Sequence, residues 1–293
     1  MYHNVFAEKT EGIISEKEFE KHMEYIKDMK TYKMEELEKM NYILDEKSIL
    51  VTFDDGYKNN YTKAFPILKK YNIKATIFLN TAYIGNDRDY LDWDEIKEMY
   101  ESGLVDFQLH THSHYPTIRK AEIKGFFEKT EGDFVKREYF SIFREGLSKK
   151  EKTEIKDFRD LDFTGLPVFK IRSQISIKGL KLKEGFMDKY RELANSEEFI
   201  RKSSRERKIF LNKLFKIQKK EFFQEISKEE FEKKVEFEIT ENKRLIEEKL
   251  NKKAEFLSYP WGHAYKGNVE KIKKLVKAKA KKLIKSLKKQ KRS

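Results

Sequence analysis

The chain has 293 residues, no cysteine and a formal net charge of +13 at pH 7. The absence of cysteine excludes a disulfide framework and thiolate chemistry, and no apolar run reaches the roughly 18 residues that a membrane-spanning helix needs. The sequence does not open with a basic segment followed by an apolar one, so no signal peptide is visible. These features predict a cytoplasmic location, with the cell envelope as the alternative if the N-terminus is truncated.

The positive charge is concentrated at the C-terminus. Residues 271–293 contain eleven lysines, one arginine and no acid, so they contribute +12 of the net charge. Their apolar residues are spaced as on one face of a helix, which predicts a basic C-terminal helix. Such a helix is either solvated or in weak contact with an anionic membrane surface. It has no aromatic residue for base stacking, so we expect no nucleic-acid partner.

Short strands and helices alternate over residues 1–118. Strands are predicted at residues 2–5, 48–53, 75–80 and 105–109, and the one at 48–53 is fully apolar at residues 49–51. Capped or amphipathic segments predict helices, one that begins at Ser15 and two that cover residues 60–71, interrupted by Pro66, and 93–102. This alternation predicts an α/β fold with a parallel sheet or barrel, whose functional residues lie at the carboxyl ends of the strands.

The sequence changes character after residue 118. Residues 119–250 are rich in Lys, Glu and Phe and have mostly helical periodicity, so we expect a large helical insertion within a single domain that spans residues 1–293. Phe163–Ile177 is the exception and is predicted to be extended. A last strand is expected at Glu255–Tyr259.

Two acids lie side by side at the end of an expected strand, in the stretch VTFDDGY at residues 51–57. Within a regular strand Asp54 and Asp55 would face opposite ways, but Gly56 allows a bend that brings both side chains to one cavity. Neighbouring anions are tolerated there if a cation lies beside them. The alternative is a solvated turn with both carboxylates in water.

Three of the six histidines follow the strand at 105–109, in the stretch HTHSH at residues 110–114. Neutral imidazole is a common ligand of zinc and similar ions, so this cluster favours a metal site. Asp55, His110 and His114 are the predicted ligands, and His112 is an alternative to either histidine. Two imidazoles and one carboxylate would leave coordination positions for water and substrate.

A third cluster, SYPWG at residues 258–262, follows the last expected strand. A rigid X-Pro step beside aromatic residues suits a substrate-binding wall made of Tyr259, Pro260 and Trp261. It equally suits ordinary packing at the end of a barrel.

The three clusters, in this order, resemble the motifs of the polysaccharide deacetylase family, also known as the NodB-homology domain or carbohydrate esterase family 4. TFDDG looks like the first motif, HTHSH matches the second and SYPWG is similar to the third. Similar stretches also occur as MYHNV at 1–5, FPILKKY at 65–71, KATIFL at 74–79 and LDWDEIKEM at 91–99. The resemblance implies a distorted (β/α)7 barrel, complete or lacking its closing strand, that contains the 119–250 insertion.

The resemblance also implies a chemistry. Asp55, His110 and His114 would hold a divalent metal, commonly zinc in this family, that activates a water. Asp54 would be the general base, and the backbone N–H of Trp261 would help to stabilise the oxyanion. The implied activity is metal-dependent removal of N-acetyl groups from amino sugars of a polysaccharide or surface-glycan precursor, so the expected partner is an N-acetylated glycan.

The chain departs from the family pattern at three points. Ser258 stands where the third motif usually begins with an arginine that orients the base, and Arg119 or Arg172 of the insertion is a candidate replacement. The gap between the second and third motifs is long. The closing motif, whose histidine protonates the leaving amine, is missing, which leaves His3, slightly favoured, and His263 as candidate acids, or no histidine at all. A glycan-binding relative that keeps the metal site but is catalytically impaired is therefore the alternative function.

Overall fold

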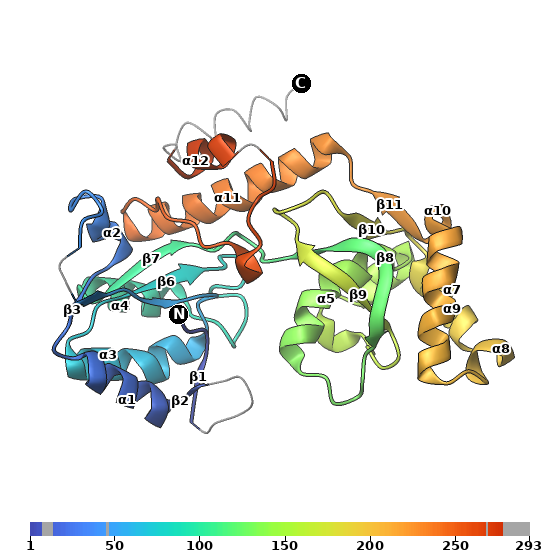
Figure 1. Cartoon of the computed structure of the whole chain (residues 1–293), viewed down its shortest axis with the longest axis horizontal. Helices are drawn as coiled ribbons and strands as arrows, with labels where there is room; N and C mark the ends of the chain where they lie inside the picture. The colour runs from blue at the N-terminus through green and yellow to red at the C-terminus, as the bar shows by residue number, and fades with distance from the viewer. Residues whose placement is uncertain (8–13, 45–46, 268, 278–293) are drawn as a thin grey trace. The chain divides into compact units, whose positions relative to one another are not determined.

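The computed structural model describes residues 1–7, 14–44, 47–267 and 269–277, and the chain folds as two units. The first unit comprises Met1–Ser113, Glu236–Gly262 and the described part of Asn268–Ser293. The second unit comprises His114–Val235 and His263–Gly267. Figure 1 shows their helices and strands, with labels where there is room. None of the described helices combines the length and the apolar character needed to cross a membrane.

The first unit is built around three parallel strands. β6 (Ala75–Leu79) lies between β5 (Val51–Phe53) and β7 (Val105–Leu109). Every residue of β6 is buried, which explains its apolar sequence ATIFL, because a parallel sheet is covered on both faces. Single parallel bridges extend this arrangement, from Tyr2 to Phe53 on one side and from Leu257 to Leu109 on the other.

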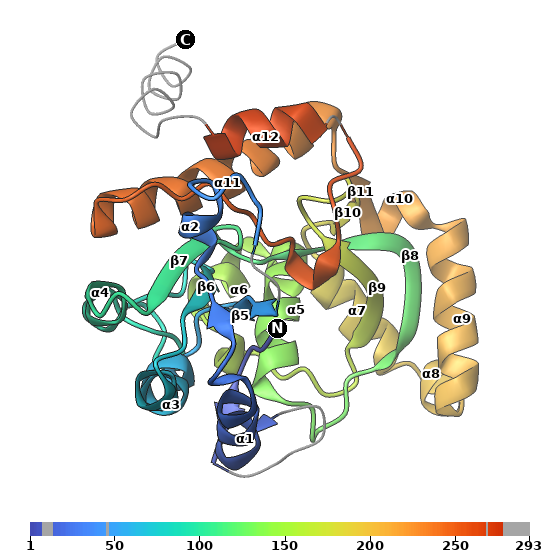
Figure 2. The same ribbon diagram turned by 60° about the vertical axis from the view of Figure 1, so that its left-hand side comes forward.

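Two more pairs of short parallel strands belong to the first unit. β1 (Val5–Phe6) pairs with β2 (Ile14–Ser15), and β3 (Lys30–Thr31) pairs with β4 (Ser48–Ile49). The helical elements are α1 (Glu16–Ile26), α2 (Met34–Leu37), the π-helical turn η1 (Asn60–Ala64), α3 (Phe65–Tyr71), α4 (Trp93–Glu101), the 3-10 turn η3 (Pro260–Gly262) and α12 (Val269–Lys277). α11 (Lys228–Leu250) begins in the second unit and continues into the first. α1 packs against α3 and α4 packs against β7, as can be followed in Figures 1 and 2.

Local sequence features place the helices of the first unit where they were predicted. The Ser15 hydroxyl accepts a hydrogen bond from the N–H of Glu18, and the Glu18 carboxylate accepts one from the N–H of Ser15, each at 3.2 Å. This reciprocal cap begins α1, whose buried face is made of Phe19, Met23 and Ile26. Pro66 lies in the first turn of α3, directly after η1, so the predicted segment 60–71 is helical without a break and changes from π-helical to α-helical geometry just before Pro66.

The parallel sheet does not form a closed barrel within the described part of the chain. The strand predicted at Glu255–Tyr259 is reduced to a single bridge at Leu257. Gln108 gives the physical reason, because its side-chain Oε1 accepts hydrogen bonds from the N–H groups of Glu255 at 3.0 Å and Phe256 at 3.1 Å, which a strand ladder would otherwise use. The alternating α/β pattern is confirmed, whereas the complete (β/α)7 barrel stays a prediction.

The second unit contains a four-stranded antiparallel sheet in the order β11–β10–β8–β9. Its strands are β8 (Pro116–Phe126), β9 (Pro167–Ser173), β10 (Leu180–Leu182) and β11 (Phe223–Glu225). β8 bends strongly in Figure 2, because its pairing with β9 shifts register at three places and such bulges bend a strand. The helical elements are α5 (Asp133–Gly146), α6 (Lys149–Glu154), η2 (Phe158–Asp160), α7 (Phe186–Ala194), α8 (Glu197–Ile200), α9 (Ser204–Ile217) and α10 (Lys219–Phe222).

Phenylalanine rings form the core of the second unit. Phe169 of β9 is fully buried, and its ring centroid lies within 6.3 Å of those of Phe143, Phe186, Phe215 and Phe223. Edge-on and tilted contacts of this kind stabilise a core beyond the burial of area alone. The Phe content of residues 119–250 is therefore explained by a core of their own.

The structure differs from the predicted insertion in one respect. Helices are the more numerous elements of residues 119–250, as predicted, but the four-stranded sheet was not expected. β9 confirms the extended segment predicted at Phe163–Ile177. Of the predicted basic helix at 271–293, residues up to Lys277 lie in α12 and residues 278–293 lie outside the described residues.

Candidate metal centre

Asp54 and Asp55 lie at the carboxyl end of β5, where the chain turns sharply. Asp55 and Gly56 have positive φ angles of 76° and 79°, and both carboxyl-bearing residues are buried, with exposed fractions of 5% for Asp54 and 2% for Asp55. The alternative of a solvated turn is therefore wrong. Position 56 requires glycine, since a Cβ there would lie 2.6 Å from Cδ2 of Leu79 as well as at an unfavourable φ.

His110 follows β7 directly and is also buried. Its Nδ1 lies 3.0 Å from the carbonyl oxygen of Ser258. Because a carbonyl can only accept, Nδ1 carries the proton and donates this bond. Its Nε2 then faces Asp55, 3.4 Å from Oδ1. Ser258 thus fixes both the tautomer and the orientation of His110, as outer partners of metal-binding histidines do.

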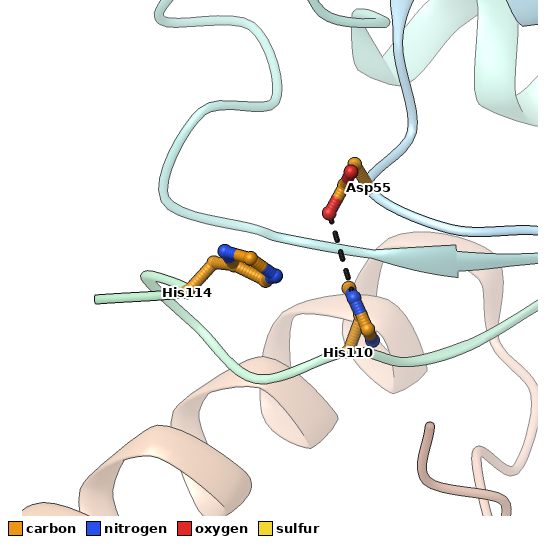
Figure 3. Close-up of side chains that lie close together, drawn as sticks. All are labelled: Asp55, His110 and His114. Carbon is orange, nitrogen blue, oxygen red and sulfur yellow. Dashed lines mark ion pairs between the residues drawn. The ribbon is translucent and has the colours of Figure 1, made fainter. Parts of the chain in front are cut away.

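His114 completes a group of three residues that could hold a metal ion. One ligand atom each from Asp55, His110 and His114 lie within 4.8 Å of one another. Figure 3 shows the three side chains directed toward a common point. The Nδ1 of His114 lies 3.7 Å from Oε1 of Glu138 on α5, so a carboxylate supports this imidazole. His114 has a positive φ of 55°, a strained conformation often found at functional sites.

The donor set fits a divalent ion such as zinc. Two ligands bound about 2.1 Å from one zinc ion at the tetrahedral angle lie about 3.4 Å apart, and 3.4 Å separates Oδ1 of Asp55 from Nε2 of His110. Two imidazoles and one carboxylate, all borne by buried or nearly buried residues, are also chemically typical ligands for such an ion.

His112, the alternative ligand, does not belong to this group. Its Nδ1 lies 3.0 Å from the hydroxyl of Thr81, and its ring packs edge-on against Phe237 at 5.4 Å between centroids. Burial lowers the pKa of His112, so its imidazole is neutral at neutral pH. This histidine anchors the loop that contains His110.

α11 holds the same loop with two buried polar side chains. Asn242 accepts a hydrogen bond from the N–H of His110 at 3.1 Å and donates to the carbonyl oxygen of Leu79 at 2.8 Å and to the hydroxyl of Thr81 at 3.0 Å. The Glu238 carboxylate accepts bonds from the N–H and the hydroxyl of Ser113, at 2.8 Å and 2.6 Å. The loop between the two histidine ligands is therefore fixed from outside.

Asp54 lies beside the three candidate ligands. Its Oδ2 is 3.9 Å from Nε2 of His110 and accepts a hydrogen bond of 3.2 Å from the Ser258 hydroxyl. Burial is the largest influence on the pKa of Asp54 and raises it, and His110 acts in the opposite direction. A cation bound by Asp55 would favour the carboxylate form of its neighbour. Asp54 is thus buried, oriented and chemically distinct from Asp55.

The residues of the third cluster adopt an unusual turn. Pro260 is buried within η3, and Trp261 has a positive φ of 54°. A non-glycine residue held in this region is strained, which marks the turn at Tyr259–Gly262 as a candidate for function. The structure describes the turn, while the substrate-binding role of Tyr259, Pro260 and Trp261 stays a prediction.

The two candidate acids lie in different surroundings. His3 is exposed, yet it is close enough to Asp54 to lower the pKa of that carboxyl group. His263 belongs to the second unit, where its Nδ1 accepts a hydrogen bond from the N–H of Ser173 at 3.2 Å. Burial lowers the pKa of His263, with a further contribution from Arg172 and Arg119. The two arginines named as substitutes for the missing one thus act on His263.

Part of the chain matches a known protein family. A sequence profile described as polysaccharide deacetylase matches residues 41–144, which contain both the acidic pair and the histidine cluster. Over 120 residues the chain is 37% identical to YxkH of Bacillus subtilis strain 168, a match that covers 39% of this chain and 42% of that protein. Over residues 41–144 this chain is thus similar to the polysaccharide deacetylase family.

Two further similar proteins are also named as deacetylases. The chain is 30% identical over 154 residues to the poly-beta-1,6-N-acetyl-D-glucosamine N-deacetylase of Staphylococcus aureus strain MSSA476, and the match covers 50% of each protein. The chain thus spans about half the length of the curated relatives it matches. A solved de-N-acetylase from Aggregatibacter actinomycetemcomitans is 16% identical, with a TM-score of 0.56 over 94% of this chain and 82% of that one, which shows a similar fold.

Sequence reasoning missed four residues that support the candidate ligands. Asn80 donates a hydrogen bond of 2.8 Å to Oδ1 of Asp55, and its position directly after β6 is a signal that could have found it. Glu138, Glu238 and Asn242 lie on helices rich in charged residues, where nothing in the sequence distinguishes a buried polar side chain from a solvated one.

Proposed function

We propose that this protein is a polysaccharide deacetylase, a metal-dependent hydrolase that removes N-acetyl groups from the amino sugars of a polysaccharide or of a surface-glycan precursor. The observation that carries the proposal is the convergence of Asp55, His110 and His114 within 4.8 Å, with Asp54 beside them. The relatives named for N-acetylglucosamine deacetylation support the substrate class.

Each residue of the site has a distinct role in this proposal. Asp55, His110 and His114 would hold the divalent ion, and zinc is the candidate because imidazole and carboxylate are its usual ligands. A bound ion of this kind makes water more acidic and polarises the acetyl carbonyl. Asp54, oriented by the Ser258 hydroxyl, takes the proton from the attacking water.

Two further roles complete the reaction. The backbone N–H of Trp261 donates a hydrogen bond to the oxyanion that forms when water adds to the acetyl carbon. The C–N bond then breaks, and His3, the candidate acid near Asp54, protonates the leaving nitrogen. Water and an N-acetyl sugar are thereby converted to acetate and a free amino sugar.

Acetate release from N-acetylglucosamine oligomers tests the proposal, measured with the full chain and added zinc or cobalt. Asp54→Asn should keep the metal, as measured by elemental analysis, and lose at least about 100-fold in turnover, because general base catalysis contributes roughly 10²–10⁴-fold. His114→Ala should lose the metal itself. A metal-loaded wild-type protein that releases no acetate would count heavily against hydrolysis.

A glycan-binding relative without turnover is the second candidate. The neutral hydroxyl of Ser258 contacts Asp54 where the family usually has an arginine, and this observation favours an impaired base. Calorimetry separates the two functions. Binding of the oligomers by metal-loaded protein, with no acetate formed, would support the binding module.

A further inference from the structure

The second unit has a cleft lined mainly by basic side chains. Its volume is about 890 Å³, within the range of roughly 300–1,000 Å³ that is usual for ligand clefts. The lining comes from β8, the segment that leads into β10, α9, α10 and the end of β11. Its basic residues are Arg119, Lys120, Lys178, Lys213, Lys216 and Lys219. None of them belongs to the candidate metal centre.

The acids of the cleft do not neutralise this charge. Glu122 and Glu225 are the acidic lining residues, so six basic and two acidic residues give a net charge of +4. Glu225 pairs with Lys219 at 2.7 Å, whereas Glu122 pairs with Lys170, outside the lining, at 2.6 Å. The other five cations are exposed, and none pairs with an acid among the residues that the structure describes.

Nearby lysines lower the pKa of the two carboxylates of the cleft, Glu122 and Glu225. The pKa of Glu122 is lowered mainly by its hydrogen bond to Lys170, and also by Lys120 and Lys216. The pKa of Glu225 is lowered mainly by Lys219, and also by Lys178 and Lys220. Lysines from separate elements therefore act together on the same region, as expected for a cleft that concentrates positive potential.

The cleft is preformed. The side chain of Asn212 on α9 accepts a hydrogen bond from the N–H of Ile123 on β8 at 2.8 Å and donates to the carbonyl oxygen of the same residue at 3.4 Å. Gly179, with a φ of 66°, packs so closely that a Cβ would lie 2.2 Å from Oγ1 of Thr117. Both contacts fix the walls before any ligand arrives, which reduces the entropy that binding would lose.

We propose that this cleft binds a polyanionic glycan chain, whose carboxylate or phosphodiester groups pair with the five exposed cations. Arg119 offers a planar fork for bidentate pairing, and the lysines supply point charges. Among the described lining residues the one aromatic, Phe215, is fully buried and cannot stack on bases, which disfavours single-stranded nucleic acid.

The choice of a glycan rests on the proposed deacetylase function, whereas the binding of a polyanion does not. Deacetylation creates ammonium groups, which this cleft repels. The groups that it binds must therefore be anions that the glycan carries in addition to its N-acetyl sugars.

Affinity measurements on the full chain test this proposal, at sodium chloride concentrations from 50 to 200 mM. The probes are polygalacturonate, poly(glycerol phosphate), neutral N-acetylglucosamine oligomers and a single-stranded oligonucleotide. Lys213→Gln/Lys216→Gln changes two exposed helix positions without removing a buried contact. Lys288→Gln/Lys289→Gln is the matched control, because it removes the same charge from the basic C-terminal segment.

The cleft variant should bind the preferred polyanion at least tenfold more weakly. If poly(glycerol phosphate) is preferred, the plot of log binding constant against log salt concentration should become shallower in the cleft variant. Its slope should decrease in magnitude by about 1.4, because two phosphate contacts are lost and each contributes about 0.7. Preference for one of the two anionic polymers identifies the charged group. Wild-type affinity in the cleft variant, or tighter binding of the oligonucleotide than of both polymers, would overturn the proposal.

Acetate release from the neutral oligomers separates this proposal from the first one. The cleft variant should release acetate at the wild-type rate, because its lysines lie outside the candidate metal centre. A metal-loaded wild-type protein that binds the polyanion through the cleft but releases no acetate would count heavily against hydrolysis and leave the cleft assignment intact.

Discussion

Removing the side chain of Asn242 tests whether α11 controls the geometry of the metal site. The residue is fully buried, and its amide makes three hydrogen bonds, to the N–H of His110, the carbonyl oxygen of Leu79 and the hydroxyl of Thr81. A hydrogen bond contributes roughly 0.5–1.5 kcal/mol net, so the three together stabilise the fold by about 1.5–4.5 kcal/mol. Asn242→Ala should reduce stability by an amount in this range.

The expected effect of Asn242→Ala on metal affinity is smaller than its effect on stability. The N–H of His110 also bonds to the carbonyl oxygen of Leu79 at 3.2 Å, so it keeps an acceptor when Asn242 is removed. His110 then loses one of the two hydrogen bonds that its backbone N–H donates and keeps the other. Outer partners of metal ligands are typically worth about 10–100-fold in affinity. We expect the lower end, a loss of about tenfold or 1.4 kcal/mol in zinc binding.

Competition with a chromophoric chelator measures this loss on the folded full chain. Asn212→Ala is the matched control, because it removes an asparagine that joins a helix to a strand in the second unit. The control should lower stability and leave zinc affinity unchanged. If Asn242→Ala binds zinc within twofold of the wild type, α11 has only a structural role and the reasoning fails.

Three other predictions concern stability. Gly56→Ala should lower the melting temperature more than Gly103→Ala, because both glycines have φ near 80° (79° and 78°) but only Gly56 would also clash with Leu79; equal shifts would contradict this. Lys252→Met leaves the fully buried Asp106 without its cation and should lower the free energy of unfolding by about 3–5 kcal/mol, as measured by chemical denaturation. Adding Asp106→Leu should restore much of this loss. The pKa of His263 is lower in the folded chain than its ordinary 6.5, so the unfolded chain binds this proton more tightly and stability should fall as pH drops below about 6.5. His263→Gln should therefore flatten the fall in melting temperature between roughly pH 7 and pH 5. An unchanged slope would refute this prediction.

The candidate ligands could be predicted because each lies in a short contiguous motif whose residue types indicate metal binding. Asp55 and His110 each come at the end of a predicted strand, and the carboxyl ends of neighbouring parallel strands meet at one edge of a sheet. His112 could not be separated from its neighbours in this way. Its exclusion depends on Thr81 and Phe237, which are distant in sequence and hold its ring.

The sheet of the second unit could not be predicted from the sequence, for a different reason. A half-buried strand is recognised by its two-residue period, yet the buried Ile118 and Ile123 of β8 are five residues apart. Register shifts between them break the period, so the segment does not alternate regularly. The lost last strand has a similar cause, since a single side chain, Gln108, takes the backbone hydrogen bonds that would have extended it.

Ser258 shows why the ligand set and the base can be altered separately. Its carbonyl oxygen holds Nδ1 of His110, and its hydroxyl holds Oδ2 of Asp54. The first contact comes from the backbone and survives any side chain at this position, including the arginine usual in the family. The second depends on the side chain alone. An exchange of arginine for serine therefore leaves the backbone contact with His110 intact and changes only what Asp54 contacts. The proposed hydrolase and the alternative glycan-binding relative would then differ in the surroundings of Asp54 and not in the metal ligands.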